Sequence, residues 1–256
     1  MIARDPWLAF ARHTPARIAL GRTGASLPTE EVLRFALAHA QARDAVHTPF
    51  DAEAVAAGIA ALRFDTAQVS SAAPTRDVYL RRPDLGRRLC DASRAVLAEA
   101  ARAPVDLALV VADGLSSSAV HAQAIPFLAA LKGWIEREKW SVAPVVVAGQ
   151  ARVALGDEAG DLLKARAVAV LIGERPGLSS PDSLGVYLTF GPRPGLSDAE
   201  RNCISNIRGE GLPHAAAAFK LAWLLKEAFR RNLTGIDLKD DSDSVLEGGL
   251  PPAYLK

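Results

Sequence analysis

The chain has 256 residues, of which 50% are hydrophobic and 23% charged, and its formal net charge at pH 7 is +1. This composition is typical of a soluble globular protein with enough residues for a sizeable core in one or two domains. A charge so close to zero provides neither a basic field for nucleic acid nor an acidic tail. We therefore expect no nucleic-acid partner.

Signals for secretion or membrane insertion are absent from the sequence. The two cysteines, Cys90 and Cys203, are typical of a reducing compartment and too few for a disulfide framework. The longest apolar runs, such as residues 167–173, are far shorter than the roughly 18 residues of a membrane-spanning helix. Charged residues and prolines interrupt the N-terminus, which therefore lacks the apolar segment of a signal peptide. These features predict a cytoplasmic protein with no membrane partner.

The first part of the chain, residues 1–103, is predicted to consist of helices joined by turns. The three predicted helices cover residues 27–46, 51–62 and about 84–101. Thr29 can cap the first of them, in which Leu33, Leu37 and Ala40 share one face at helical spacing. We expect no strand in this part, so the sequence predicts a small all-helical N-terminal domain.

After Pro104 the pattern changes to short apolar strands that alternate with helices. The five predicted strands cover residues 105–114, 143–149, 167–174, 184–190 and 203–207. Strands that are apolar on both faces indicate a mostly parallel sheet with helices on both faces. Residues 104–238 are thus interpreted as a Rossmann-like α/β domain. Residues 239–256 lack periodicity and are predicted to be a flexible C-terminal tail.

Ligands of an open parallel sheet bind at the carboxyl ends of its strands. The loops expected there cover residues 113–119, 149–153 and 173–180. Asp113 and the serines of the first loop could begin an anion-binding helix, but a turn and a serine-capped helix explain them more simply. The sequence contains neither the glycine-rich dinucleotide fingerprint nor the P-loop motif, which weakens a nucleotide-binding interpretation.

Glu174 directly follows the most apolar of the predicted strands. Its carboxylate could accept hydrogen bonds from the amide or hydroxyl groups of a ligand, and Arg175 could hold it or contact a partner chain. The alternative is a solvated charge pair in a loop. The sequence pattern alone favours neither, although loops at this edge of a sheet often carry function.

The other reactive side chains form no recognisable constellation. Cys203 has no histidine at a spacing that would make it a nucleophile, and His214 is expected to cap a helix. The scattered histidines and two cysteines show no metal-ligand spacing. Five arginines between Arg76 and Arg88 could contact phosphate or an acidic partner, but a solvated helix start is the favoured interpretation. We therefore predict no catalytic residue and no metal site.

Five long motifs occur in the order in which one known family carries them. They are GRTGASLPTEEVLRFALAHAQARDAV (21–46), YLRRPDLGRRL (79–89), VVADGLSSSAV (110–120), LIGERPGLSSPDSLGVYLTF (171–190) and RNCISNIRGEGL (201–212). Over residues 5–238 the chain resembles the small (light) subunit of ethanolamine ammonia-lyase. The length of these motifs makes the resemblance specific.

The resemblance implies a lyase of ethanolamine catabolism that depends on adenosylcobalamin, a cobalt corrinoid, and forms acetaldehyde and ammonia by radical rearrangement. It also implies a hetero-oligomer in which a large subunit binds the substrate and this chain, inactive alone, covers the cobalamin at the interface. Residues 104–238 would then be the cobalamin-binding domain. By motif position, the implied cobalamin contacts are Val153, Glu174 and Cys203, none of them catalytic.

Two departures from the family pattern affect these expectations. The chain begins almost at the conserved body, without the extension that directs some members into a bacterial microcompartment, so we expect either a free cytoplasmic or an encapsulated enzyme. The residues after Leu238 exceed the family body and receive no role. The main alternative is an independent Rossmann-like enzyme that binds a nucleotide or phosphate at residues 113–119, and another is a scaffold subunit without a ligand.

Overall fold

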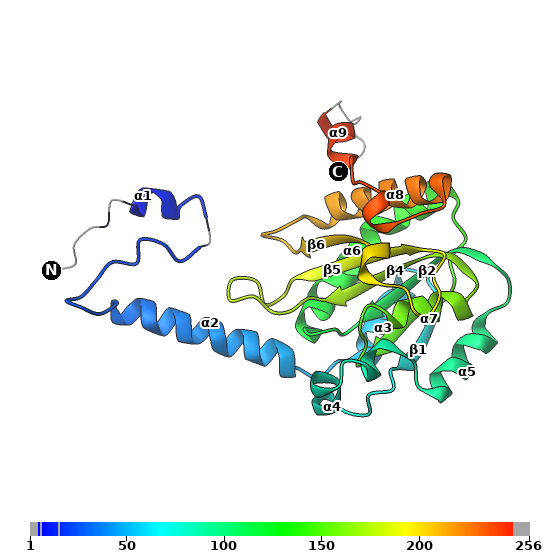
Figure 1. The fold of residues 1–256 in the computed structure, drawn as a ribbon, viewed down its shortest axis with the longest axis horizontal. Helices are drawn as coiled ribbons and strands as arrows, with labels where there is room; N and C mark the ends of the chain where they lie inside the picture. Colours follow the sequence, from blue (N-terminus) through cyan, green and yellow to red (C-terminus); the bar gives the residue numbers. More distant parts are fainter. Residues whose placement is uncertain (1–4, 6, 15, 248–256) are drawn as a thin grey trace.

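A six-stranded sheet forms the centre of the molecule (Figure 1). The structure is a computed structural model that describes residues 5, 7–14 and 16–247. The strands are β1 (Thr66–Ser70), β2 (Val105–Ala112), β3 (Val145–Gly149), β4 (Ala165–Gly173), β5 (Leu184–Phe190) and β6 (Asn202–Ile207). In space they follow the order β1-β3-β2-β4-β5-β6, in which β1 to β4 are parallel and β5 and β6 are antiparallel to their neighbours.

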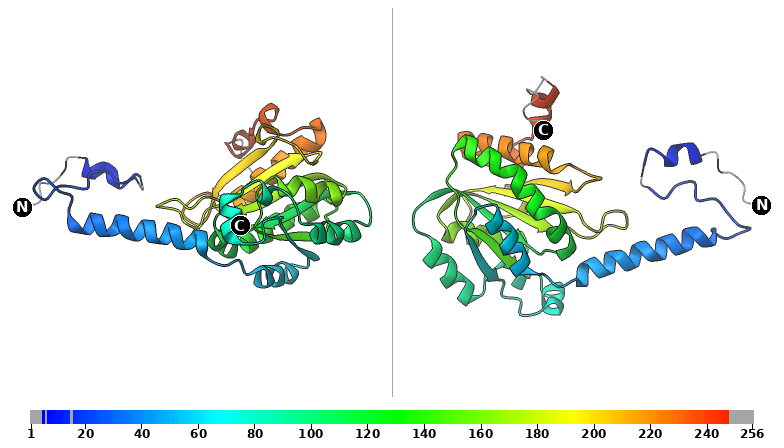
Figure 2. Two further views of the ribbon diagram at one scale, coloured as in Figure 1. Left: turned by 60° about the horizontal axis from the view of Figure 1, so that its bottom comes forward. Right: turned by 180° about the vertical axis from the view of Figure 1, so that it is seen from behind.

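Helices cover both faces of this sheet (Figures 1 and 2). The α-helices are α1 (Leu8–Ala11), α2 (Thr29–His47), α3 (Ala52–Ala61), α4 (Arg76–Arg81), α5 (Asp91–Ala100), α6 (Ser117–Glu138), α7 (Leu155–Leu162), α8 (His214–Arg231) and α9 (Ser242–Glu247). Three short 3₁₀-helices are η1 (Leu85–Arg87), η2 (Asp198–Glu200) and η3 (Gly235–Asp237). None of the helices in the described part of the chain has the length and apolar character needed to span a membrane.

The alternation of side chains along β2 divides the core into two layers. Leu107, Leu109 and Val111 belong to the cluster that packs under α3, α6 and α8, whereas Ala108 and Val110 belong to the cluster under α5 and α7. Successive residues of a strand point to opposite faces, so a strand covered on both sides must be apolar throughout. The uninterrupted apolar runs of β2, β3 and β4 have this origin, and the predicted α/β class with helices on both faces is confirmed.

The sheet is less parallel than the sequence predicts, because β5 and β6 reverse direction. Only residues 174–183 separate β4 from β5, and no helix lies among them. A parallel neighbour needs a crossover of a dozen or more residues, usually a helix, whereas a short loop returns the chain antiparallel. The Rossmann-like prediction can therefore apply only to the parallel strands β1 to β4, and it stays a prediction for them.

The prediction that the first hundred residues contain no strand is wrong, so the N-terminal part is not all-helical. β1 pairs with β3 from Thr66 opposite Val145 to Ser70 opposite Gly149. It lies at the edge of the sheet, and its buried residues alternate with exposed polar ones, so it lacks the apolar run that marks the other strands. The sheet therefore includes residues that precede position 103. The predicted domain boundary between residues 103 and 104 stays a prediction.

The two ends of the described chain depart from the body in different ways. The described residues before position 48 (5, 7–14 and 16–47) form an arm in which α2 projects away from the sheet, and the segment containing α1 lies near the far end of α2 (Figures 1 and 2). At the other end, Lys220 Nζ donates to Ser242 Oγ (3.0 Å) and Asp243 Oδ1 (2.7 Å), which holds α9 against α8. The predicted flexible tail therefore includes a short helix, and its residues 248–256 lie outside the described part.

Candidate functional site

A crevice forms at the carboxyl ends of β2 and β3, because the helices after these strands, α6 and α7, cover opposite faces of the sheet. Asp113, the residue after β2, fills this crevice and is 1% exposed. Its Oδ1 accepts hydrogen bonds from the backbone amides of Gly114 and Ala151, both at 2.9 Å, and its Oδ2 pairs with Arg76 Nη1 at 3.2 Å. Burial raises the pKa of Asp113, while these contacts oppose that effect. Two cavities lie at this edge: Gly114, the residue after Asp113, lines the first, and Asp113 and Arg76 themselves line the second.

The first of them, which we call the Glu174 cavity, measures about 440 Å³ and opens at the ends of β2, β3 and β4. Its lining brings together Val153 and Glu174 from two of the loops that the sequence singled out. Arg152, Arg175 and Tyr187 also line it. Two of the three residues predicted to contact a cofactor therefore face the same space.

The Glu174 carboxylate is held in one orientation by protein groups. Its Oε2 accepts hydrogen bonds from Ser183 Oγ (2.5 Å) and from the amide of Asn206 (3.3 Å). Gly185 leaves room for it, since a Cβ there would lie 2.8 Å from Oε1. Within the described residues, Oε1 has no hydrogen-bond donor, so this oxygen can accept from a ligand.

Glycines allow the loops around the cavity to approach closely. A Cβ on Gly173 would lie 2.0 Å from the carbonyl oxygen of Ser116, and one on Gly114 would lie 2.3 Å from the carbonyl oxygen of Gly173. Gly114 also has φ +58°, a value that glycine adopts readily. The amide of Leu115 donates to Gly173 O at 2.9 Å. The end of β4 and the loop after β2 therefore touch backbone to backbone, which sets the position of Glu174.

Tyr79 and Arg152 form a part of the site that the sequence did not predict. Tyr79 is fully buried, its hydroxyl donates to Ala151 O (3.1 Å), and burial raises its pKa. The guanidinium groups of Arg76 and Arg152 lie over its ring, 4.9 and 4.4 Å from the centroid. Arg152 Nε is buried without a hydrogen-bond partner in the part of the chain that the structure describes. A cationic donor with unused capacity thus lines the Glu174 cavity.

Cys203 lies outside the lining of the cavity, one strand away from it. It is directly opposite Tyr187 in the antiparallel β5–β6 pair, so both side chains are on the same face. Although Cys203 is exposed, desolvation of its thiol raises the pKa, and the Tyr187 hydroxyl bonded to it only partly opposes this effect. A raised pKa favours the neutral thiol over the thiolate at neutral pH, and the role of Cys203 stays a prediction.

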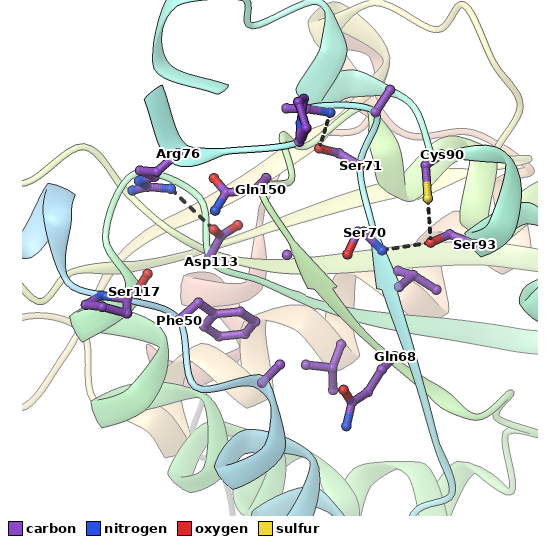
Figure 3. Close-up of a pocket in the computed structure, with 18 of the residues that line it drawn as sticks. Phe50, Gln68, Ser70, Ser71, Arg76, Cys90, Ser93, Asp113, Ser117 and Gln150 are labelled. Carbon is purple, nitrogen blue, oxygen red and sulfur yellow. Dashed lines mark hydrogen bonds and ion pairs between the residues drawn. The ribbon is translucent and has the colours of Figure 1, made fainter. Parts of the chain in front are cut away.

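The second cavity, which we call the Ser70 cavity, measures about 980 Å³ and lies between the ends of β1 and β3 (Figure 3). Polar side chains such as Gln68, Ser71 and Gln150 line it together with the ring of Phe50. On its wall, Ser93 Oγ accepts from the Ser70 amide at 2.8 Å and contacts Cys90 Sγ at 3.2 Å. It contains none of the three predicted contact residues.

The serine loop after β2 is closed by protein groups. Ser116 caps α6, as its Oγ accepts from the amide of Ala119 (3.1 Å), and the same hydroxyl donates to Pro181 O (2.8 Å). Ser116 and Ser117 are both buried. The favoured interpretation of a serine-capped helix is confirmed, and the Ser116 hydroxyl is occupied by Ala119 and Pro181.

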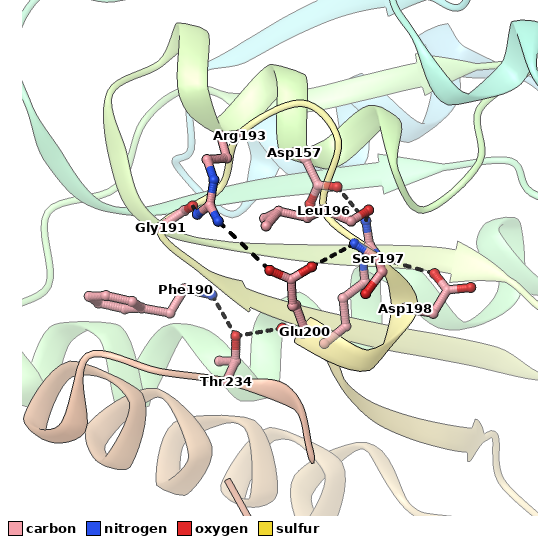
Figure 4. A network of polar contacts seen from close by, with 10 residues as sticks. Asp157, Phe190, Gly191, Arg193, Leu196, Ser197, Asp198, Glu200 and Thr234 are labelled. Carbon is pink, nitrogen blue, oxygen red and sulfur yellow. Dashed lines mark hydrogen bonds and ion pairs between the residues drawn. The ribbon is translucent and has the colours of Figure 1, made fainter. Parts of the chain in front are cut away.

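A buried polar network secures the connection between β5 and β6 (Figure 4). Arg201 pairs with Asp157 of α7 and also donates to Asp198 Oδ1 (3.0 Å) and Leu196 O (3.1 Å). Burial raises the pKa of Asp157 to about 6 against the opposing effect of Arg201. Thr234 Oγ1 donates to Glu200 O (2.7 Å), which ties the connection to the chain after α8. These contacts position β6 and Cys203, and the same connection lines a cavity of about 700 Å³ together with Arg88 and Arg94.

The fold and cavity define a mixed α/β protein with a ligand-sized site at the carboxyl edge of its sheet. Throughout the described residues, no group of three His, Cys, Asp or Glu side chains could hold a metal ion. A family model described as ethanolamine ammonia-lyase light chain matches residues 4–239. The chain belongs to this family, so the resemblance noted in the sequence is confirmed.

Relatives support this assignment over most of their length. The ethanolamine ammonia-lyase small subunit of Pseudomonas fluorescens strain Pf0-1 is 56% identical over 242 residues, which cover 93% of this chain and 88% of the relative. That of Pseudomonas aeruginosa strain UCBPP-PA14 is 55% identical over 253 residues, which cover 97% and 93%. That of Pseudomonas syringae pv. tomato strain DC3000 is 56% identical over 241 residues, covering 93% and 84%.

Proposed function

We propose that this chain is the small subunit of an adenosylcobalamin-dependent ethanolamine ammonia-lyase, in which it covers the cofactor at the interface with a large catalytic subunit. Family membership and relatives named small subunits support this proposal. The observation that carries it is that Glu174 and Arg152 line one cavity, while Glu174 Oε1 and Arg152 Nε have no hydrogen-bond partner among the described residues. The assembled enzyme is cytoplasmic, either free or within a bacterial microcompartment.

The donors and acceptors of the Glu174 cavity fit the chemistry of a corrinoid. Glu174 Oε1 can accept from an amide side chain of the corrin or from a hydroxyl of the nucleotide loop. Arg152 can donate to an amide oxygen or to the phosphodiester, and Val153 offers an apolar surface. Cys203, beside Tyr187 at the margin, is proposed as a neutral contact.

The size of the cavity favours a shared cofactor. Pockets that enclose a drug-sized ligand measure about 300–1,000 Å³. The Glu174 cavity, at about 440 Å³, holds only part of a molecule as large as a cobalamin. The remainder must be enclosed by another surface, which we assign to the large subunit.

This chain positions and shields the cofactor and performs no step of the reaction. When bound, adenosylcobalamin supplies the radical chemistry through homolysis of its cobalt–carbon bond. Ser183 and the Asn206 amide hold Glu174, and stacking on Tyr79 holds Arg152, so both groups are oriented before the ligand arrives. Cys203 and Tyr187, whose pKa values are both raised, keep their protons near neutral pH.

A substitution at Glu174 tests the proposal in the complex assembled with the large subunit. Glu174→Ala should weaken cobalamin binding about tenfold or more, because a hydrogen bond to a charged group contributes about 1.5–3 kcal/mol. Glu136→Gln, at an exposed carboxylate of α6, is the matched control and should leave the affinity unchanged. Equal affinities for Glu174→Ala and the unaltered complex would remove Glu174 from the site. Ethanolamine deamination by this chain alone would contradict the division of labour.

A further inference from the structure

The exposed large hydrophobic residues of the molecule are concentrated in the arm. Eight of the ten found among the described residues lie between positions 7 and 37, namely Trp7, Leu8, Phe10, Leu27, Val32, Leu33, Phe35 and Leu37. Single exposed apolar residues are normal on a surface, but a concentration of them indicates a binding surface. The arm therefore exposes more of the large apolar side chains than any other described part of this chain, which indicates a surface that binds another protein.

Within the arm, α2 presents a continuous apolar stripe. Leu33, Ala36, Leu37 and Ala40 follow the spacing i, i+3, i+4 and i+7, which places them on one face of the helix. Leu33 and Leu37 are 64% and 59% exposed. The only buried residues of α2 are Ala38 and Ala45, both off the stripe. The face that the sequence predicts to pack is therefore uncovered in the isolated chain.

The charged residues next to the stripe are already paired within the helix. Arg34 donates to Glu30 Oε1 at 2.5 Å and to Glu31 Oε1 at 2.9 Å. The charged side chains at the start of α2 are therefore paired with one another. The apolar stripe remains as the surface of the helix that can bury area against a partner. An amphipathic helix with anchors at this spacing is typical of binding in an apolar groove.

The arm is attached at the edge of the sheet that holds the Glu174 cavity. Near the end of α2, the carbonyl of Val46 accepts from Arg76 Nε at 2.9 Å, and Arg76 in turn pairs with Asp113. Arg17 Nη2 donates to Leu178 O (3.2 Å), in the loop that follows Glu174. Figures 1 and 2 show α2 projecting from this region. Whatever covers the stripe therefore lies beside the cavity.

We infer that the stripe of Leu33, Ala36, Leu37 and Ala40 docks into an apolar groove of the large subunit. This inference rests on the proposed function, in which the large subunit encloses the part of the cofactor that the Glu174 cavity leaves open. Because Arg17 holds the arm to the loop after Glu174 and Arg76 holds the end of α2 to the sheet edge, a subunit that covers the cavity also extends along the arm. The arm is thus an anchor that sets the large subunit over the shared cofactor.

The experiment compares two charge substitutions on opposite faces of α2 in the co-expressed complex. Leu33→Glu introduces a charge into the stripe, and Ala42→Glu introduces the same charge nine residues later, on the opposite face of the helix. Dissociation on dilution is followed by mass photometry, with cobalamin binding measured at saturating subunit concentration. We expect Leu33→Glu to raise the dissociation constant at least tenfold and Ala42→Glu to change it less than twofold. Leu33→Ala, which adds no charge, should weaken the complex in the same direction and guards against misfolding.

The possible outcomes separate this inference from the proposed function. If the unaltered chain binds the large subunit and cobalamin, and both Leu33 variants bind equally well, the docking surface is wrong while the proposed function stands. If the unaltered chain binds neither, the proposed function itself fails. If the Leu33 variants abolish self-association of the small subunit and leave the heteromeric complex intact, the stripe belongs to a second copy and the inference is overturned.

Discussion

Asp113 and Arg76 form an ion pair that lines the Ser70 cavity at the carboxyl edge of the sheet, and Gly114, the residue after Asp113, lines the Glu174 cavity. The side chain of Asp113 is 1% exposed and that of Arg76 18%. Arg76 also donates to the carbonyls of Val46 and Gly114, so this pair joins the arm to the loop after β2. The ion pair therefore fixes the geometry of this edge. Ligands of open α/β sheets usually bind in the crevice at this position, but here the Asp113 side chain fills it.

Removal of Arg76 should strongly destabilise the chain. Arg76→Met leaves the buried Asp113 carboxylate without its cationic partner, which costs about 3 kcal/mol in the free energy of unfolding. Since burial already raises the pKa of Asp113, loss of Arg76 raises it further. The folded variant then binds an additional proton that the unfolded chain releases, so its deficit should shrink as the pH falls from 8 to 5. Urea unfolding at the two pH values measures this, and a deficit independent of pH would contradict it.

Close packing of the backbone at Gly173 should make this position intolerant of a methyl group. Gly173→Ala would place Cβ 2.0 Å from Ser116 O, so the two loops must separate at a cost of about 1–3 kcal/mol. Gly133→Ala is the control, since a Cβ at this exposed position of α6 meets no atom within 4 Å. It should stabilise the helix by about 0.5–1 kcal/mol. Thermal unfolding of both variants measures the difference, and equal stability would refute the packing argument.

His214 should make stability dependent on pH in the weakly acidic range. Desolvation lowers its pKa from 6.5, and its Nε2 lies 2.8 Å from Gln123 Oε1 at the start of α8. The unfolded chain therefore binds a proton more readily, so this contribution to stability is present above pH 6.5 and is lost as the pH falls below it. His214→Gln should flatten the pH profile of the melting temperature in this window. An identical slope in the variant and the unaltered chain would assign the dependence elsewhere.

Two substitutions of Tyr79 should separate its hydrogen bond from its stacking. Tyr79→Phe removes the hydroxyl that donates to Ala151 O and should cost about 1 kcal/mol of stability. It keeps the ring under Arg152, so cobalamin affinity in the complex should change little. Tyr79→Leu also removes the cation–π contact that holds Arg152 and should weaken cobalamin binding severalfold. Equal affinities for the two variants would show that stacking does not position Arg152.

Three of the five strands that the sequence predicted are buried on both faces. β2, β3 and β4 read as uninterrupted apolar runs, a pattern that follows directly from their two covered faces. β1 escaped prediction because it combines five residues of mixed polarity at an edge, where pairing with β3 compensates for weak local preference. The direction of β5 likewise depended on the length of the loop before it and not on its own residues.

Some residues of the candidate site could be predicted from the sequence, and others are brought together only by the fold. The position of Glu174 at the end of a strand is a local property, and the sequence singled it out. Arg152 and Tyr79 are more than seventy positions apart, and nothing in either segment predicts that one stacks on the other. The only available signal was that Tyr79 follows Arg76 by three positions on a helix, which puts the two side chains on one face.

Sequence alone determined the family, the α/β class and the residues expected to contact the cofactor, because these depend on local patterns and long motifs. Tertiary structure decided that Val153 and Glu174 share one cavity while Cys203 lies outside it beside Tyr187. It also decided that Asp113 fills the crevice and that the apolar face of α2 remains uncovered. The physical reason is that composition and periodicity fix which faces are apolar, whereas the path of the chain fixes what each face meets.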